Sequence, residues 1–429
     1  MPTSNPVKKN LAYALVIVCL FVVAVAAAVW FTPSEKMTFS STSIAATTTA
    51  ATTTPSTPAL FVVTHIPTPK SVRAAYFTSW AAGTPSFQKQ MFSLLSASGT
   101  QLNAVVIDIK DYSGRIGYAV DDPRFKDPSI DAIGSAQVRI PDIEQFLASL
   151  HARHIYVIGR IQDFEDPFAL KTHPEWYVKK ANGTLWKDAG GAYWIDPDNK
   201  SAWSYLVAIA KQGYDVGFDE INFDYVRFPS DGSVNAAVYD LPASTTKAEA
   251  ITSFFSYLHG QLSPLGIPTS ADIFGQVTSD TGDMGIGQHF EDVLPYFDFV
   301  DPMVYPSHYI DGFDGYQNPA AHPYEIVKFA MDHAVARAVA ASSTPSKVRP
   351  WLQGFDLGAV YTPNMLEAQI QATADAGLGS WLVWNAASVY TRYASLFSEQ
   401  SVIVSPIKPI ISTSTVIYAT TSVMAVSKK

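Results

Sequence analysis

Three carboxylates and an arginine lie within a run of thirteen residues that otherwise has the composition of a buried strand. The run is Gly217–Pro229, and its charged members are Asp219, Glu220, Asp224 and Arg227. An unpaired ion in a protein interior costs several kcal/mol, so such charges need partners or a function. A strand alternates its side chains between two faces, which groups Phe218, Glu220, Asn222 and Asp224 on one side. Carboxylates placed this way can serve as a general acid and a base.

Strands and helices alternate on both sides of this run. Strands are expected at 72–78, 104–110, 155–161, 217–229, 267–274, 297–305, 348–354 and 380–385. Helices are expected between them at 85–97, 141–152, 200–212, 247–262, 324–340 and 363–376. Eight strands alternating with helices predict an α/β fold, the (β/α)8 TIM barrel. No G-x-G-x-x-G motif follows the first strand, which disfavours a doubly wound sheet.

Polar residues recur where the predicted strands end. Because the carboxyl ends of barrel strands meet at one face, these side chains are expected to line a single pocket. They are Asp108, Lys110, Arg160, Gln162, Asp224, Arg227, Asp272, Asp301, Tyr305, Gln353, Trp384 and Asn385.

Three strings in this part of the chain carry a family resemblance. They are Phe223–Pro229 (FDYVRFP), Ser270–Gly275 (SADIFG) and Pro302–Tyr309 (PMVYPSHY). In this order they resemble the putative glycosyl hydrolase domain family of bacterial proteins, over about residues 70–400. The resemblance implies a barrel with a carbohydrate-type pocket. The chain departs from the family pattern at Asp301, where a small residue is expected. This extra acid either joins the site or pairs with a neighbouring cation.

A glycosidase of this kind needs two carboxyl groups with different roles. One protonates the leaving oxygen, and the other attacks the anomeric carbon or activates water, so their pKa values must differ. Asp224 is predicted as the nucleophile or base, with Arg227 as the cation that keeps it ionised. Asp272 is predicted as the acid, by analogy with barrels similar to the α-amylase group. Glu220 either joins the catalysis or forms an ion pair with Lys110 or Arg160.

The long loop at residues 173–197 and His308 supply further candidates. Trp176, Trp186 and Trp194 either form the floor of a sugar subsite or cap the barrel as a small core. Asn182-Gly183 in the same loop predicts a hairpin turn. His308 follows a strand in the PSHY string and is predicted to contact substrate.

The two ends of the chain differ from its middle. Residues 11–31 carry no charge and follow Lys8 and Lys9, which predicts a membrane anchor about 31 Å long. A cleaved signal peptide is the alternative. The expected order is a cytoplasmic segment (1–10), the anchor (11–31), a Ser/Thr/Ala/Pro-rich linker (32–65), the barrel (66–400) and a tail (401–429). The barrel is therefore expected outside the cytoplasm.

Composition narrows the choice of ligand. A net charge of −9 disfavours a nucleic-acid partner. No cofactor and no metal ion is predicted, and the expected partners are a carbohydrate substrate and the membrane. Two alternatives stay open. One is a carbohydrate-binding barrel without activity, and the other is a metal-assisted hydrolase that uses Asp108, Asp224 and His308 as ligands.

Overall fold

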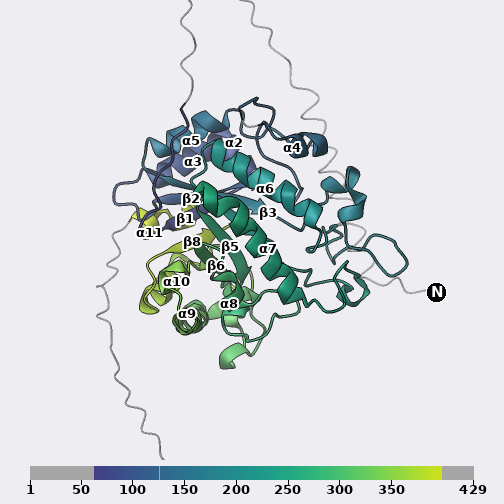
Figure 1. Ribbon diagram of the computed structural model, residues 1–429. Coiled ribbons are helices and arrows are strands. Elements are labelled where there is room, and N and C mark those ends of the chain that lie inside the picture. The colour runs from purple at the N-terminus through teal and green to yellow at the C-terminus, as the bar shows by residue number, and fades with distance from the viewer. Residues whose placement is uncertain (1–61, 125, 399–429) are drawn as a thin grey trace, which may run out of the picture. The chain divides into compact units, whose positions relative to one another are not determined.

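The computed structural model describes residues 62–124 and 126–398, and these contain a closed barrel of eight parallel strands in chain order. Each strand pairs with the next along the chain, and the eighth pairs with the first. The TIM-barrel prediction is therefore confirmed (Figure 1). The strands are β1 (Arg73–Phe77), β2 (Ala104–Lys110), β3 (Tyr156–Gln162), β4 (Glu220–Asp224), β5 (Thr269–Phe274), β6 (Phe299–Met303), β7 (Trp351–Gln353) and β8 (Trp381–Trp384).

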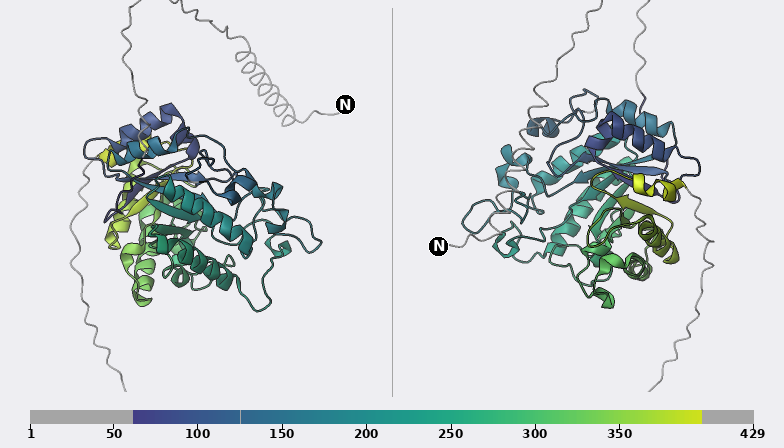
Figure 2. Two further views of the ribbon diagram at one scale, coloured as in Figure 1. Left: turned by 45° about the horizontal axis from the view of Figure 1, so that its top comes forward. Right: turned by 180° about the vertical axis from the view of Figure 1, so that it is seen from behind.

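Helices surround the barrel on its outer side (Figures 1 and 2). Their starts follow from local chemistry: α7 has a Thr246–Glu249 capping box, and α10 has Thr362 as its N-cap with a proline in its first turn. The long helices are α3 (Pro85–Leu95), α5 (Ile143–His151), α6 (Lys200–Asp215), α7 (Lys247–Leu262), α9 (Pro323–Ala340) and α10 (Pro363–Asp375). The short ones are α2 (Ser79–Gly83), α4 (Pro128–Ile133), α8 (Phe290–Val293) and α11 (Ala394–Ser398).

The alternation of strand side chains divides the core into two layers. Outward-facing residues of β4, such as Ile221 and Phe223, pack in the large cluster between strands and helices. Phe218 belongs to that outer cluster as well, which corrects its predicted place beside Glu220. It precedes β4, so the alternation within that strand does not extend to it. Inside the barrel lies a smaller cluster that includes Tyr76, Tyr156 and Trp351.

A buried ion network fills the barrel interior below the strand ends. Arg349 is fully buried and binds Glu220 through two nitrogens, at 2.6 and 3.1 Å. The same guanidinium binds Asp301 at 2.9 Å through each of two nitrogens. Ser270 Oγ and Tyr156 OH donate to the remaining positions on Glu220, at 2.6 and 3.0 Å. Good geometry and further hydrogen bonds are what a buried ion pair requires.

This network corrects the sequence prediction for Glu220. Its cation is Arg349, which lies 129 residues away in the chain, and is neither Lys110 nor Arg160. For Asp301, the structure decides between the two expected roles, because this acid pairs with Arg349.

The amino-terminal end of β4 holds the first described segment of the chain. Asp219 accepts hydrogen bonds from the backbone N–H groups of Ile66 and Val157, at 2.7 and 2.8 Å. His151 Nε2 lies 3.1 Å from the same carboxylate. Asp219 therefore has a structural role at the face opposite the strand ends that carry Asp224.

Among the described residues, no helix combines the length and apolar character that a bilayer crossing requires. The predicted anchor at 11–31 and the tail at 401–429 lie outside the described residues, as does the linker up to residue 61.

Candidate active site

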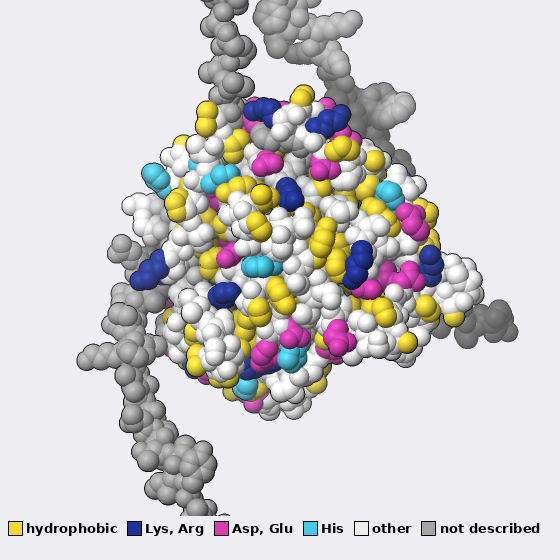
Figure 3. Space-filling model, in the orientation of Figure 1, with side chains coloured by type: hydrophobic (Ala, Val, Ile, Leu, Met, Phe, Trp, Pro, Cys, Tyr) yellow, Lys and Arg dark blue, Asp and Glu magenta, His cyan; other side chains and the backbone are white. Residues whose placement is uncertain are grey.

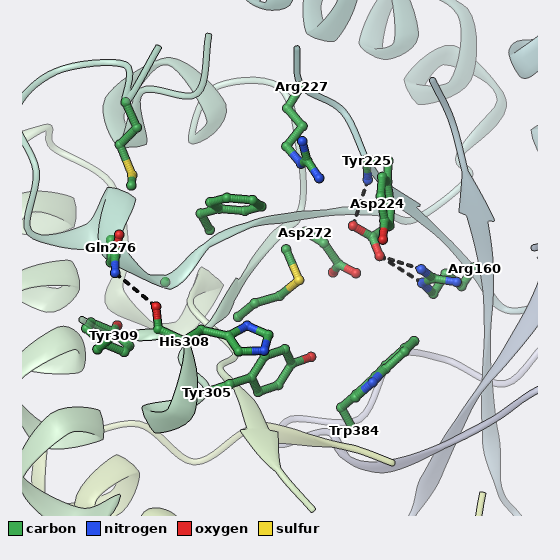
Figure 4. Close-up of a pocket in the computed structure, with 14 residues that line it drawn as sticks. Arg160, Asp224, Tyr225, Arg227, Asp272, Gln276, Tyr305, His308, Tyr309 and Trp384 are labelled. Carbon is green, nitrogen blue, oxygen red and sulfur yellow. Dashed lines mark hydrogen bonds and ion pairs between the residues drawn. The ribbon is translucent and has the colours of Figure 1, made fainter. Parts of the chain in front are cut away.

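A cavity of about 360 Å³ opens at the carboxyl ends of the strands. Its walls come from β3 to β6, from β8 and from the loops that follow these strands, as in other barrels whose sites lie at this face. Figure 4 shows Asp224 and Asp272 side by side in its wall, with Tyr305, His308 and Trp384 across from them. The lining residues are Arg160, Asp224, Tyr225, Arg227, Asp272, Phe274, Gly275, Gln276, Met284, Met303, Tyr305, His308, Tyr309 and Trp384.

Asp224 ends β4, and Arg160 on β3 holds it in place. Arg160 Nε and Nη2 both donate to Asp224 Oδ2, at 3.0 and 2.5 Å. Tyr225 N donates to the other oxygen, Oδ1, at 2.6 Å. Tyr225 has a φ of 58°, a left-handed conformation that is rare for a tyrosine and frequent near functional sites. Charge-assisted hydrogen bonds of this kind are made with a carboxylate.

The cation beside Asp224 is therefore Arg160, and the predicted role of Arg227 is corrected. The register explains this, because Arg160 and Asp224 both point into the barrel from neighbouring strands. Arg227 lies beyond the strand end, where its guanidinium packs 4.8 Å from the ring centre of Trp194 and 4.7 Å from that of Phe274. It still lines the cavity and brings a positive charge to its wall.

Arg160 also binds a second acid, Asp108. Its Nη1 donates to Asp108 Oδ1 at 2.8 Å, and Tyr76 OH donates to Oδ2 at 2.6 Å. Burial raises the pKa of Asp108 to about 6, although Arg160 and Tyr76 act in the opposite direction. Trp384 stacks on Tyr76 with ring centres 3.9 Å apart. Asp108 lies behind Arg160 and outside the cavity lining, where it orients the guanidinium.

Asp272 on β5 is the neighbour of Asp224 across the sheet. The last paired residues of these strands are Phe223 and Ala271, so the next residues, Asp224 and Asp272, lie side by side. Asp272 Oδ1 accepts hydrogen bonds from Asn222 Nδ2 and Trp351 Nε1, both at 2.8 Å. Among the described residues nothing donates to its Oδ2. The second oxygen is therefore the one available to carry a proton.

Burial raises the pKa of Asp272 well above its usual range, and the negative charges of Asp224 and Asp301 raise it further. Such surroundings favour the protonated form of the carboxyl group. Asp224, by contrast, is held by a guanidinium and a backbone N–H. Two adjacent carboxyl groups with such different surroundings can divide acid and base roles between them.

The remaining predicted site residues fall into two groups. Tyr305, His308 and Trp384 line the cavity as expected. Lys110, Gln353 and Asn385 do not. Lys110 is buried and binds Asp166 Oδ2 at 3.0 Å and the Gln162 carbonyl. Gln353 and Asn385 bind loop carbonyls, of Phe355 at 3.0 Å and Gly354 at 2.7 Å. The alternation of side chains along a strand indicates where the strand ends. It does not indicate which side chains near that end reach the cavity.

The tryptophans of the loop at 173–197 form a small core. Trp186 and Trp194 are nearly fully buried, and neither lines the cavity. Their ring nitrogens donate to the Ser233 carbonyl and to Asp188 Oδ2, each at 2.9 Å. The predicted hairpin turn is confirmed: Gly183 has a φ of 81°, and the backbone N–H of Lys180 binds the Thr184 carbonyl at 2.7 Å.

Several residues of the site were not singled out from the sequence. Asn222 and Trp351 bind Asp272, and Arg349 neutralises the acids beneath it. The alternation of side chains along the predicted strand pointed to Asn222, because it lies on the same face as Asp224. Arg349 lies in the predicted strand at 348–354, where a buried charge needs a partner, but its partners on β4 and β6 are far away in the sequence. Gln276 and Tyr309 also line the cavity, and both lie in or next to the family strings.

The structure also bears on other ligand classes. Among the described residues, no three His, Cys, Asp or Glu side chains are grouped as a metal site. On the face shown in Figure 3, the Lys and Arg side chains are scattered among acidic and neutral ones.

The fold and the site together define a β/α barrel with two neighbouring carboxyl groups at the carboxyl end of its strands. A family model agrees with this class: the putative glycosyl hydrolase domain matches residues 74–390. The chain belongs to that family. No curated protein matches the chain.

Two solved structures are similar to parts of this chain. A hypothetical protein from Ruminiclostridium thermocellum is 35% identical, with 46% of this chain and 96% of that chain covered and a TM-score of 0.41. The PgaB (BpsB) glycoside hydrolase domain from Bordetella bronchiseptica is 13% identical, with 76% and 98% covered and a TM-score of 0.54. At such identity the second likeness supports the barrel alone.

Proposed function

We propose that this barrel hydrolyses a glycosidic bond of an envelope or extracellular glycan, with Asp224 and Asp272 as its carboxylate pair. The observation that carries the proposal is the difference in surroundings between two acids that share one cavity wall. Asp272 is buried beside other acids, whereas Asp224 is bound by Arg160. Glycoside hydrolysis needs this combination of a proton donor and a carboxylate.

In this mechanism Asp272 is the general acid. Its Oδ1 accepts two hydrogen bonds, so the proton resides on Oδ2 and passes from there to the leaving oxygen. The departing sugar thus leaves as an alcohol, and no separate alkoxide has to form. The proton is retained before reaction because ionising Asp272 would bury a second negative charge beside Asp224.

Asp224 acts on the anomeric carbon, either directly or through a water molecule that it deprotonates. Arg160 and Tyr225 N fix the carboxylate in one orientation, which keeps it aimed at the cavity. The separation of the two carboxyl groups when substrate is bound decides between these routes. About 5–5.5 Å corresponds to retention at the anomeric carbon, and about 6.5–9.5 Å corresponds to inversion.

The rest of the cavity suits a sugar. The Trp384 and Tyr305 rings offer flat apolar faces to its C–H groups, while Arg227 and His308 offer polar groups to its hydroxyls. A cavity of about 360 Å³ lies within the size range of small-molecule sites.

The test is the release of reducing ends from a panel of envelope and storage glycans by the full chain. Release that disappears in Asp224→Asn and in Asp272→Asn supports the proposal, whereas equal release by the wild type and both variants contradicts the site assignment. Specific binding without any release would instead favour the carbohydrate-binding barrel. Proton NMR of the first product reports retention or inversion.

We propose further that the barrel works outside the cytoplasm, held by an anchor at residues 11–31. The proposal rests on sequence alone: an uncharged run follows two lysines. Carbonate-resistant sedimentation with the membrane, together with protease access from outside, is the expected result. Recovery of a shortened soluble chain would indicate a cleaved signal peptide instead.

A further inference from the structure

A second cavity opens at the same face of the barrel, beside the first. It has a volume of about 340 Å³, and its walls come from the segments that follow β7 and β8. The lining includes Phe355, Asp356, Asn385, Ala387, Arg392 and Tyr393. The role proposed above for Asp224 and Asp272 does not use this space.

The two cavities share a wall. The Phe355 ring lines the second cavity, and its centre lies 5.5 Å from the ring of Tyr305 and 6.1 Å from that of His308, both of which line the first. On the other side, Trp384 lines the first cavity and the next residue, Asn385, lines the second. Residues that line the two cavities are therefore in contact with one another or adjacent in the chain.

Hydrogen bonds hold the residues that lie between the two cavities. Gln353 Nε2 donates to the Phe355 carbonyl at 3.0 Å, and its Oε1 accepts from Ser307 N at 3.1 Å. Asn385 Nδ2 donates to the Gly354 carbonyl at 2.7 Å. Gln353 and Asn385, which were expected to line the pocket at the strand ends, thus hold the segments that separate the two cavities.

The chemistry of the second cavity suits a neutral polyol. Arg392 and Asp356 form a two-point ion pair at 2.6 and 3.1 Å, and both side chains are close to half exposed. A sugar hydroxyl can accept from the guanidinium and donate to the carboxylate at once. The pair has no net charge, so it selects neither an anion nor a cation, and Phe355 adds an apolar ring face.

We infer that the second cavity is a subsite for a further sugar of the same glycan, so that the protein binds an extended chain rather than a single terminal sugar. This inference rests on the proposed function, since it takes the ligand of the first cavity to be a glycan. It specifies the substrate class as an oligosaccharide or polysaccharide.

The test compares binding of a short and a long ligand by calorimetry. The full chain with Asp224→Asn serves as a background that cannot turn over. The probes are the disaccharide and the hexasaccharide of the glycan that the wild type cleaves or, without cleavage, binds most tightly in the panel. In this background Ala387→Leu fills the second cavity from an exposed position. Ala386→Leu is the matched control, because Ala386 is also exposed but does not line the cavity.

We expect Ala387→Leu to weaken hexasaccharide binding about tenfold, the effect of losing one or two good contacts, and to leave disaccharide binding unchanged. Arg392→Met should have the same length-dependent effect, with Lys328→Met on α9 as its control. Hexasaccharide affinity that is unchanged in both variants overturns the inference. So does an equal loss for both ligands, because the substitution would then act on the first cavity.

The inference and the proposed function fail in different ways. In one outcome, binding is tight and length-dependent and Ala387→Leu weakens it, but the wild type releases no reducing ends. That outcome supports the subsite and contradicts the proposed hydrolysis. Release of reducing ends with no preference for longer chains supports the proposed hydrolysis and contradicts the subsite. A chain that binds no glycan of the panel overturns both.

Discussion

Arg160 on β3 donates two hydrogen bonds, from Nε and Nη2, to a single carboxylate oxygen of Asp224 on the neighbouring strand β4. The contact fixes one carboxyl group as a hydrogen-bond acceptor in the wall of the cavity. It leaves Asp272, the next acid in the same wall, without a cation of its own among the described residues. This asymmetry gives the pair its proposed division of labour.

Replacement of Asp224 by asparagine should abolish the proposed activity. The side chain keeps its shape but cannot act as a nucleophile or base, so kcat should fall at least about a thousandfold. The measurement is reducing-end release at saturating glycan, with Asp332→Asn on the exposed face of α9 as the control. A fall of less than tenfold would place the key carboxylate elsewhere.

Replacement of Asp301 by asparagine should move the alkaline limb of the pH–rate profile to lower pH. The negative charge of Asp301 raises the pKa of Asp272, so removing it lets the acid lose its proton earlier as the pH rises. Trp351→Phe should move the same limb the opposite way. It removes a hydrogen bond at 2.8 Å that favours the charged form of Asp272. Shifts in the same direction, or none, would contradict the assignment of Asp272 as the acid.

Arg349 should be a major determinant of stability. Arg349→Met leaves Glu220 and Asp301 buried without a cation, which should lower the free energy of unfolding by about 3–5 kcal/mol. Urea denaturation is the measurement, and Lys328→Met, which breaks an exposed pair on α9, should cost less than about 1 kcal/mol. Adding Glu220→Gln and Asp301→Asn to Arg349→Met should restore much of the loss. A triple variant no more stable than the single one would mean that the charges are not the cause.

The stability of the barrel should depend on the protonation of Asp108. Its pKa is raised to about 6 in the folded state, above the value of about 4 for an unfolded chain. The folded state therefore binds the proton more tightly than the unfolded state does. The resulting contribution to the free energy of unfolding is complete below about pH 4 and is lost as the pH rises through 6. The loss amounts to about 3 kcal/mol, to order of magnitude.

Asp108→Asn tests this linkage, because it removes the titrating group while keeping an oxygen near Tyr76 and Arg160. Urea denaturation between pH 4 and 7 should give a shallower pH dependence for the variant than for the wild type. Identical slopes would show that Asp108 does not titrate in this range.

Local patterns in the sequence were enough to predict the barrel. The predicted strand at 104–110 and the predicted helix at 247–262 have the bounds that the structure gives them. The predicted strand at 155–161 is shifted from β3 by one residue at each end. Such agreement is expected where apolar residues and caps are close in sequence, because each element is then specified by its own neighbours. The same patterns led to Asp224 and Asp272, which lie next to each other at the ends of adjacent strands.

The identity of each partner depended on the tertiary structure. Arg227 is three residues from Asp224 in the chain, yet Arg160, which is 64 residues away, is the cation that binds it. Glu220 pairs with Arg349 for the same reason, since both side chains point into the closed barrel. Trp186 and Trp194 have the residue type of a sugar platform, but loop packing buries them. Sequence spacing specifies which face of a strand a side chain occupies, whereas barrel closure and register decide which other side chains it meets there.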